Sequence, residues 1–109
     1  MNLIEFENIV LKPSQVKPVI VDFWATWCDP CKILDPILDE LALENNNAWA
    51  FVKIDTDESK DIATEYDILG VPAIRIFHKG ELIGKFNGLM WKKDMERWIG
   101  EQLEMINKQ

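Results

Sequence analysis

A dense apolar run followed closely by two cysteines constrains this chain more than any other feature. The run, Val19–Trp24, contains one acid, Asp22, and its density predicts a buried strand. Four residues later the first cysteine, Cys28, stands just before a segment of helical apolar spacing that extends from Pro30 to Glu44. Pro30 suits the first turn of that helix. The cysteines are therefore predicted to lie where a buried strand passes into a helix.

The N-terminal part of the chain carries weaker signals. Leu3–Glu7 alternates apolar and acidic residues, which predicts a half-exposed strand. Pro13 and Pro18 favour turns over a long helix between that strand and the apolar run. Within the helix after the cysteines, Pro36 predicts a kink.

The rest of the chain alternates between strand and helix patterns. Trp49–Asp55 predicts a third strand, and Asp57 is suited to cap a short helix that turns Ile62 and Tyr66 inward. Ala73–His78 and Leu82–Asn87 predict an antiparallel hairpin turning at Lys79-Gly80. A last helix is indicated by an apolar stripe of Met95, Trp98, Ile99, Leu103 and Ile106. We expect one α/β domain over residues 1–109, with a mixed central sheet and helices on both faces.

Composition and charge exclude several classes of function. The 109 residues carry a net charge of −7, so phosphate backbones should repel the chain and nucleic acid is not an expected partner. Glu5 and Glu7 stand where a secretory signal needs a basic and then apolar start, and no run is long enough to cross a bilayer. We therefore expect a cytoplasmic protein that is not bound to membranes.

The two cysteines, Cys28 and Cys31, are too few for a disulfide framework or for a zinc site built from cysteine alone. The single His78 lies far along the chain at a strand end, where we interpret it as a solvent-facing residue, so no metal site is expected. A helix N-terminus stabilises an anion through its free N–H groups and its dipole, which makes Cys28 the candidate nucleophile. Two intervening residues bring Cys31 within bonding reach as the candidate resolving thiol. Inert buried cysteines, or half of a metal site, remain the alternative.

Several motifs together resemble the thioredoxin family over nearly the whole chain. They are Asp22-Phe23-Trp24-Ala25 leading into Trp27-Cys28, Cys31-Lys32 continuing into Pro36-Ile37-Leu38-Asp39-Glu40, Lys53-Ile54-Asp55, and Gly70-Val71-Pro72. The resemblance implies the thioredoxin-like fold and a redox-active Cys28–Cys31 disulfide with no bound cofactor. It also implies that the Cys28 thiolate, an accessible sulfur, attacks a partner disulfide and that Cys31 resolves the mixed disulfide.

The resemblance further assigns roles to residues outside the pair. Asp22 would be a buried base that takes the proton of Cys31, with a pKa raised by desolvation and with Lys53 as its partner. Pro72 would follow a cis peptide bond in a loop that lies against the cysteines. The flat surface that docks partners would be formed by Trp27, Pro30, Val71, Pro72, Gly88 and Leu89.

Three features depart from the family pattern. Asp29 replaces the usual glycine between the cysteines and places a fixed anion near the thiolate, which should oppose its formation and, beside Pro30, tune the redox potential. The alternative is that Asp29 points into water and only complements the helix dipole. Ala73 stands where threonine is frequent, and the short, proline-marked segment after Glu7 suggests that the family's first helix is missing or reduced to a turn.

The leading functional hypothesis is a monomeric protein-disulfide reductase that acts on disulfide-containing proteins. As the resemblance implies, a flavin-dependent thioredoxin reductase drawing on NADPH would recharge it. A disulfide oxidase or isomerase is a second hypothesis, against which Asp29 and the missing export features argue. A third is an adaptor that binds partners through the thioredoxin surface without redox turnover.

Overall fold

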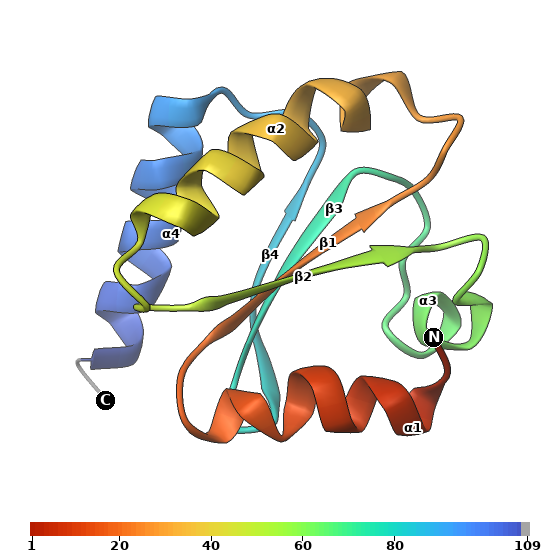
Figure 1. Ribbon diagram of the computed structural model, residues 1–109, viewed down its shortest axis with the longest axis horizontal. Helices are drawn as coiled ribbons and strands as arrows, with labels where there is room; N and C mark the ends of the chain where they lie inside the picture. The colour runs from red at the N-terminus through yellow and green to blue at the C-terminus, as the bar shows by residue number, and fades with distance from the viewer. Residues whose placement is uncertain (108–109) are drawn as a thin grey trace.

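A four-stranded mixed sheet forms the centre of the computed structural model, which describes residues 1–107. The strands are β1 (Val19–Trp24), β2 (Ala50–Asp55), β3 (Ala73–His78) and β4 (Glu81–Asn87), in the spatial order β2-β1-β3-β4. β1 runs parallel to β2 and antiparallel to β3, and β3 runs antiparallel to β4. The predicted mixed sheet is confirmed, with the strand that precedes the cysteines at an interior position (Figure 1).

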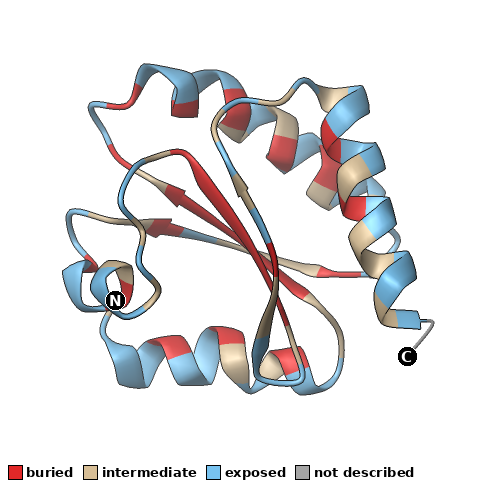
Figure 2. Cartoon of the chain, turned by 180° about the vertical axis from the view of Figure 1, so that it is seen from behind, coloured by how far each residue is buried: buried red, intermediate tan, exposed pale blue. Residues whose placement is uncertain are grey.

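Helices cover both faces of this sheet, as predicted. α2 (Asp29–Glu44) and α4 (Lys92–Asn107) pack on one face, while α3 (Lys60–Glu65) and the N-terminal helical segment pack on the other. Burial follows this arrangement, with buried positions along the central strands and on the inward sides of the helices (Figure 2). Lys92 ties the two helices of the first face together, since its Nζ lies 2.8 Å from Glu44 Oε1 and 3.4 Å from Glu40 Oε1.

Strand alternation decides which side chains of β1 meet which helices. Val19, Val21 and Phe23 join the core beneath α3 and the N-terminal segment. Ile20 joins the opposite core, beneath α2 and α4. Asp22 is two residues from Ile20 and therefore shares its face, so the single acid of this strand is directed beneath α2.

The prediction of a strand over Leu3–Glu7 is wrong, because this part of the chain is helical. α1 (Leu3–Phe6) continues into a π-helical stretch, Glu7–Leu11, and a 3-10 turn follows at Pro13–Gln15. The first helix is thus neither missing nor reduced to a single turn.

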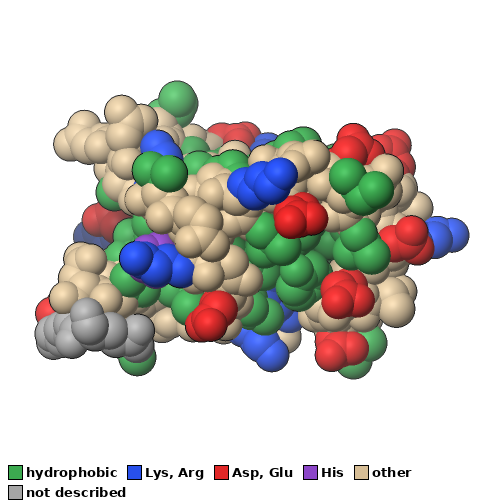
Figure 3. Space-filling view, turned by 90° about the horizontal axis from the view of Figure 1, so that it is seen from below, with side chains coloured by type: hydrophobic (Ala, Val, Ile, Leu, Met, Phe, Trp, Pro, Cys, Tyr) green, Lys and Arg blue, Asp and Glu red, His purple; other side chains and the backbone are tan. Residues whose placement is uncertain are grey.

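A capping box begins this helical segment. Glu5 N–H donates to Asn2 Oδ1 at 2.9 Å, and Asn2 N–H donates to Glu5 Oε1 at 3.2 Å. The buried residues are Phe6 and Val10, four apart, which is a helical spacing that the short alternation at Leu3–Glu7 concealed. The same segment leaves Ile4 and Val16 exposed, and Figure 3, which shows the molecule from this side, has hydrophobic side chains among acidic and basic ones.

The connections beyond β2 agree with the sequence except at one cap. α3 begins after Ser59, not under an Asp57 cap, although Ile62 is buried and Tyr66 packs against the same core as predicted. The hairpin turns at Lys79-Gly80, where both residues have positive φ (53° and 78°), as a two-residue turn of this kind requires. Among residues 1–107, no helix is both long and apolar enough to cross a bilayer.

We predict that Phe6→Ala destabilises the fold by about 3–5 kcal/mol, because a large aromatic side chain is removed from the core. The Phe6 ring centroid lies 5.0 Å from that of Tyr66 and 5.4 Å from that of Phe77. Ile4→Ala on the same helix is the control, since Ile4 is 72% exposed and should cost less than about 0.5 kcal/mol. Urea unfolding measures both, and equal losses would contradict the helical packing of this segment.

Candidate redox-active site

The two cysteines lie at the N-terminus of α2, where β1 delivers the chain. Cys28 is the N-cap residue of the helix, with extended backbone angles, and its Sγ accepts a hydrogen bond of 3.2 Å from the Cys31 N–H. The two residues are joined by a disulfide, with their Cα atoms 5.3 Å apart. Their predicted proximity and helix-terminal placement are both confirmed. The N–H that contacts Cys28 Sγ is one of the donors that a helix N-terminus leaves unpaired.

The expectation of an accessible sulfur is wrong for this disulfide state. Cys28 is 3% exposed and Cys31 is 1% exposed, because both pack with Ala25 beneath Trp24 and Val71. Cys28 is still the more exposed of the two. A reacting group must therefore approach along the surface formed by the neighbouring loops.

The loops beside the disulfide bring together the residues assigned to docking. The Val71–Pro72 peptide bond is cis, as the resemblance implied, and Val71 packs against the cysteines. Gly88 N–H donates to the carbonyl of Pro72 at 2.9 Å, which fixes the 88–89 loop against the cis-proline loop. Gly88 adopts φ of +105°, a conformation that favours glycine. Leu89, which follows it, is exposed.

Trp27 directly precedes Cys28 in the chain and is also exposed. Its side chain is oriented by a 2.9 Å hydrogen bond from Nε1 to Asp57 Oδ2. Asp57 thus orients the indole next to Cys28 in place of capping α3. With 66% of Trp27 exposed, a large aromatic surface borders the reactive pair.

Asp29 points away from the sulfurs into water. Its side chain is 92% exposed, and its Oδ1 lies 3.5 Å from Nζ of Lys32 one turn along α2. Solvent and the neighbouring ammonium screen its charge from Cys28. Pro30, also exposed, occupies the first turn of the helix, as predicted.

Asp22 is buried as predicted, and its environment disfavours the ionised form. It is 0% exposed, and neither carboxylate oxygen has a hydrogen-bond donor. Burial is the largest cause that raises the pKa of Asp22 to about 9. The neighbouring Asp35 adds to the increase, through charge repulsion and because the two carboxyl groups can share a hydrogen bond when Asp22 is protonated. Lys53 opposes it electrostatically.

Lys53 does not bind Asp22 directly, which corrects the predicted pairing. The two residues are Cα partners on β1 and β2, but Nζ of Lys53 lies 3.0 Å from both carboxylate oxygens of Asp39 on α2. The lysine therefore acts on the Asp22 pKa at longer range.

Asp35 is the residue at this site that the sequence interpretation missed. It lies four residues after Cys31, so it occupies the same side of α2 one turn further along. Its Oδ1 is buried without a donor, like both oxygens of Asp22. The sequence did contain a signal for Asp35, because a residue four positions after a cysteine at the start of a helix lies on the same side of that helix.

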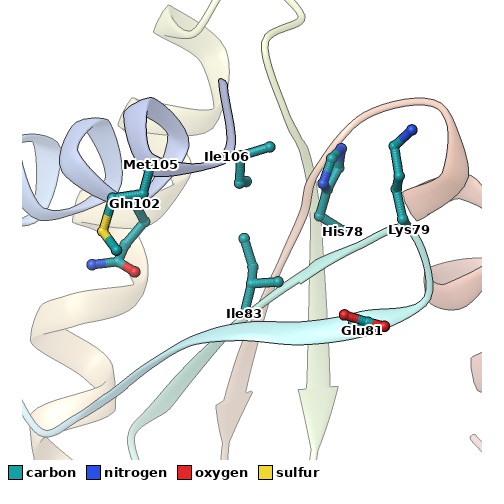
Figure 4. A pocket seen from close by; sticks show the side chains of 7 residues that line it. All are labelled: His78, Lys79, Glu81, Ile83, Gln102, Met105 and Ile106. Carbon is teal, nitrogen blue, oxygen red and sulfur yellow. The ribbon is translucent and has the colours of Figure 1, made fainter. Parts of the chain in front are cut away.

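A hollow at the other end of the sheet lies away from the disulfide. A cavity of about 420 Å³ lies between the β3–β4 turn and the end of α4, lined by His78, Lys79, Glu81, Ile83, Gln102, Met105 and Ile106 (Figure 4). Because β3 runs antiparallel to β1, this turn is at the other end of the sheet from the cysteines. Within residues 1–107, no group of three or more His, Cys, Asp or Glu side chains is arranged to hold a metal ion.

A mixed sheet in this strand order, with a disulfide at the N-terminus of the helix after its buried strand, defines a class of thiol–disulfide oxidoreductases. Comparison with known proteins agrees with this class. Residues 1–101 match the family model described as Thioredoxin. A protein named "Thioredoxin" from Rickettsia typhi is 40% identical over 100 residues, which cover 92% of this chain and 93% of that protein.

Two further relatives are longer than this chain. "Thioredoxin M-type, chloroplastic" from Chlamydomonas reinhardtii is 47% identical over 76 residues, or 70% of this chain, and the match spans about half (53%) of that protein. "Bifunctional thioredoxin reductase/thioredoxin" from Mycobacterium leprae is 35% identical over 94 residues, which cover 86% of this chain and 20% of that protein. The chain belongs to the thioredoxin family, and its cysteine pair gives it thiol–disulfide oxidoreductase and protein-disulfide reductase activity.

We predict that Asp22→Asn stabilises the protein at neutral and alkaline pH. In the unfolded chain an aspartate loses its proton near pH ~3.9, whereas folded Asp22 holds its proton up to a pKa of about 9. The folded state therefore binds more protons between these values, and the stability of the unmodified protein falls as pH rises through that window. Urea unfolding at pH 5, 7 and 9 should show a variant whose advantage grows with pH, and a constant difference would refute the buried, protonated carboxyl.

Proposed function

We propose that this chain reduces disulfide bonds of partner proteins, with Cys28 as the attacking thiol and Cys31 as the resolving thiol. The observation that carries the assignment is the position of Cys28 as the N-cap of α2, with the Cys31 N–H directed at its sulfur. In the dithiol form the same N–H and the helix dipole stabilise a thiolate on Cys28. Cys31, already inside the helix and less exposed, is suited to the second step.

The reaction proceeds in two exchanges. The Cys28 thiolate attacks one sulfur of the partner disulfide, forms a mixed disulfide and expels the partner's other sulfur as a thiolate. Cys31 then loses its proton and attacks Cys28 Sγ, which forms the Cys28–Cys31 disulfide and releases the second partner thiolate. Two electrons pass from the dithiol to the partner. Asp22 is the proposed acceptor of the Cys31 proton, which it takes when ionised or as it releases its own proton, because a carboxylate of raised pKa is a stronger base than an ordinary aspartate. Lys53 is proposed to limit that rise in pKa.

Partner segments are proposed to dock on the surface around the nearly sealed disulfide. That surface consists of Trp27, Pro30, Val71, Gly88 and Leu89 around Pro72, which is itself buried. The exposed Trp27 indole on one side and the exposed Leu89 on the other provide apolar contact. Val71 is half-buried in the connection between α3 and β3, and its backbone is proposed to pair with an extended chain.

The wider setting is also a proposal. A NADPH-dependent flavin thioredoxin reductase would recharge the disulfide, which the printed name of the Mycobacterium leprae relative, with reductase and thioredoxin in one chain, supports. We propose a monomer that acts in the cytoplasm on disulfide-containing proteins. We also propose that it has no nucleic-acid partners, because a net charge of −7 repels phosphate backbones.

Reduction of insulin disulfides with dithiothreitol as electron donor tests the assignment. The unmodified chain should accelerate insulin precipitation, and Cys28→Ser should abolish the acceleration. Cys31→Ser should instead accumulate a mixed disulfide that mass spectrometry detects, because the resolving thiol is missing. Acceleration that survives Cys28→Ser would reject Cys28 as the nucleophile. Loss of reduction without any loss of partner binding in both cysteine variants would be compatible with the adaptor hypothesis only if the unmodified chain also fails to reduce insulin.

We predict that Asp29→Gly lowers the pKa of the Cys28 thiol and makes the redox potential less negative, since an anion near the thiolate is removed. The change should be small, a few tenths of a pH unit, because a charge in water and beside Lys32 is screened. Thiolate absorbance at 240 nm and equilibration with glutathione measure the two quantities. Lys32→Gln should shift both in the opposite direction, and an increase of the pKa in Asp29→Gly would contradict the argument.

A further inference from the structure

Two carboxyl groups meet beneath α2 without the donors that carboxylates require. Asp22, from β1, and Asp35, from α2, face each other within hydrogen-bonding range. Asp22 Oδ1 and Oδ2 and Asp35 Oδ1 are all shut off from solvent, and no other donor in residues 1–107 reaches them. An ionised carboxylate only accepts hydrogen bonds, so the contact is a hydrogen bond only when one of the two groups carries a proton.

We infer that Asp22 and Asp35 act as a carboxyl pair that holds one proton between them, and that Asp35 passes to solvent the proton that Asp22 takes from Cys31. This inference rests on the proposed function. Asp35 acts on the cysteines only through Asp22, so it is a positioning residue.

Burial gives the pair a direction. Asp22 is 0% exposed and does not contact solvent. Asp35 is half-buried, with Oδ1 sealed on the inner side while the residue as a whole keeps contact with solvent. A proton on Asp22 therefore leaves by way of Asp35.

The other groups around the pair do not supply the missing proton. α2 contributes Asp39, whose charge disfavours ionisation of Asp22, and β2 contributes Lys53, whose ammonium is bound to Asp39 at 3.0 Å. β3 contributes the apolar Ile74 directly opposite Asp22. The next residue of β3, Arg75, is directed to the other face of the sheet by strand alternation, where its Nη1 donates to backbone carbonyls.

The placement suits the resolving step. Before that step the pair carries one negative charge and one proton, which Asp22 holds. As the Cys31 sulfur attacks Cys28 Sγ, Asp22 takes the Cys31 proton and passes its own proton to Asp35. The S–S bond between the cysteines forms, the bond from Cys28 to the partner sulfur breaks, and the partner leaves as a thiolate. The pair, now with two protons, returns one to water through Asp35.

A titration of the carboxyl carbons by ¹³C NMR on the reduced full-length chain tests the pair itself. In the unmodified chain the Asp22 signal should titrate in two steps, because it also reports the protonation of the carboxyl group next to it. In Asp35→Asn, the Asp22 signal should titrate in one step with a midpoint lower by about one unit or more, because a like charge has been removed. Glu40→Gln is the matched control, since it removes one charge from the same helix at a side chain that is 61% exposed and bound to Lys92.

An unchanged Asp22 midpoint in Asp35→Asn, or an equal shift in Glu40→Gln, would overturn the pair. Asp35→Glu, which keeps a carboxyl at the position, should restore the two steps of the Asp22 signal. Loss of that rescue would also count against the inference, because it would assign the effect to packing.

Stopped-flow reaction of the reduced chain with Ellman's reagent tests the proton path. The first thionitrobenzoate released reports attack by Cys28, and the second reports resolution by Cys31. We expect Asp35→Asn to move the pH midpoint of the second release downward by about one unit and to leave the first in place. A second release with the midpoint of the unmodified chain would overturn the role of Asp35 even if the first is normal. If Cys28 of the unmodified chain reacted no faster than a free thiol, the proposed function itself would fail, which is a distinct result.

Discussion

The passage of β1 into α2 is the constraint on which the rest of the structure depends. β1 is paired on both edges, by β2 and β3, so its direction and register are fixed along its whole length. The chain then turns into a helix in which the Cys31 N–H, one of the donors that a helix N-terminus leaves unpaired, points at the Cys28 sulfur. The rigidity of an interior strand thereby places a sulfur at a helix terminus, which is the local electrostatic condition for a stable thiolate.

The same junction places a buried acid where it disfavours its own ionisation. Strand alternation puts Asp22 on the face of Ile20, which α2 and α4 cover, and Asp22 is fully buried there. A buried carboxyl without a donor costs stability, so its presence in an otherwise apolar strand is unfavourable for folding. The cost is accepted in the one strand that leads to the cysteines, and the raised pKa of Asp22 is its chemical consequence.

Three separate connections complete the site. Val71 from the cis-proline loop packs on the disulfide, the Gly88 N–H holds the following loop against Pro72, and Asp57 orients the Trp27 indole. These residues are far apart in the sequence. They lie together because the C-terminal ends of β1, β2 and β4 and the N-terminal end of β3 are at the same end of the sheet. The two sulfurs are nearly inaccessible to solvent, so a partner reaches them only if it fits the surface at this end of the sheet.

Local patterns determined much of this protein before any tertiary contact was known. The apolar run, the helical spacing after Cys28 and the Lys79-Gly80 turn predicted the mixed sheet, α2 and the hairpin, because period and turn chemistry act over a few residues. The motifs around Cys28, Cys31 and Pro72 predicted the family. The N-terminal helix was missed, because alternation over Leu3–Glu7 fits a strand until Phe6 and Val10 are known to share a core with Tyr66 and Phe77. Tertiary structure alone decided that Lys53 binds Asp39, that Asp57 binds Trp27 and that Asp35 faces Asp22, because these contacts join elements whose relative placement no local pattern encodes.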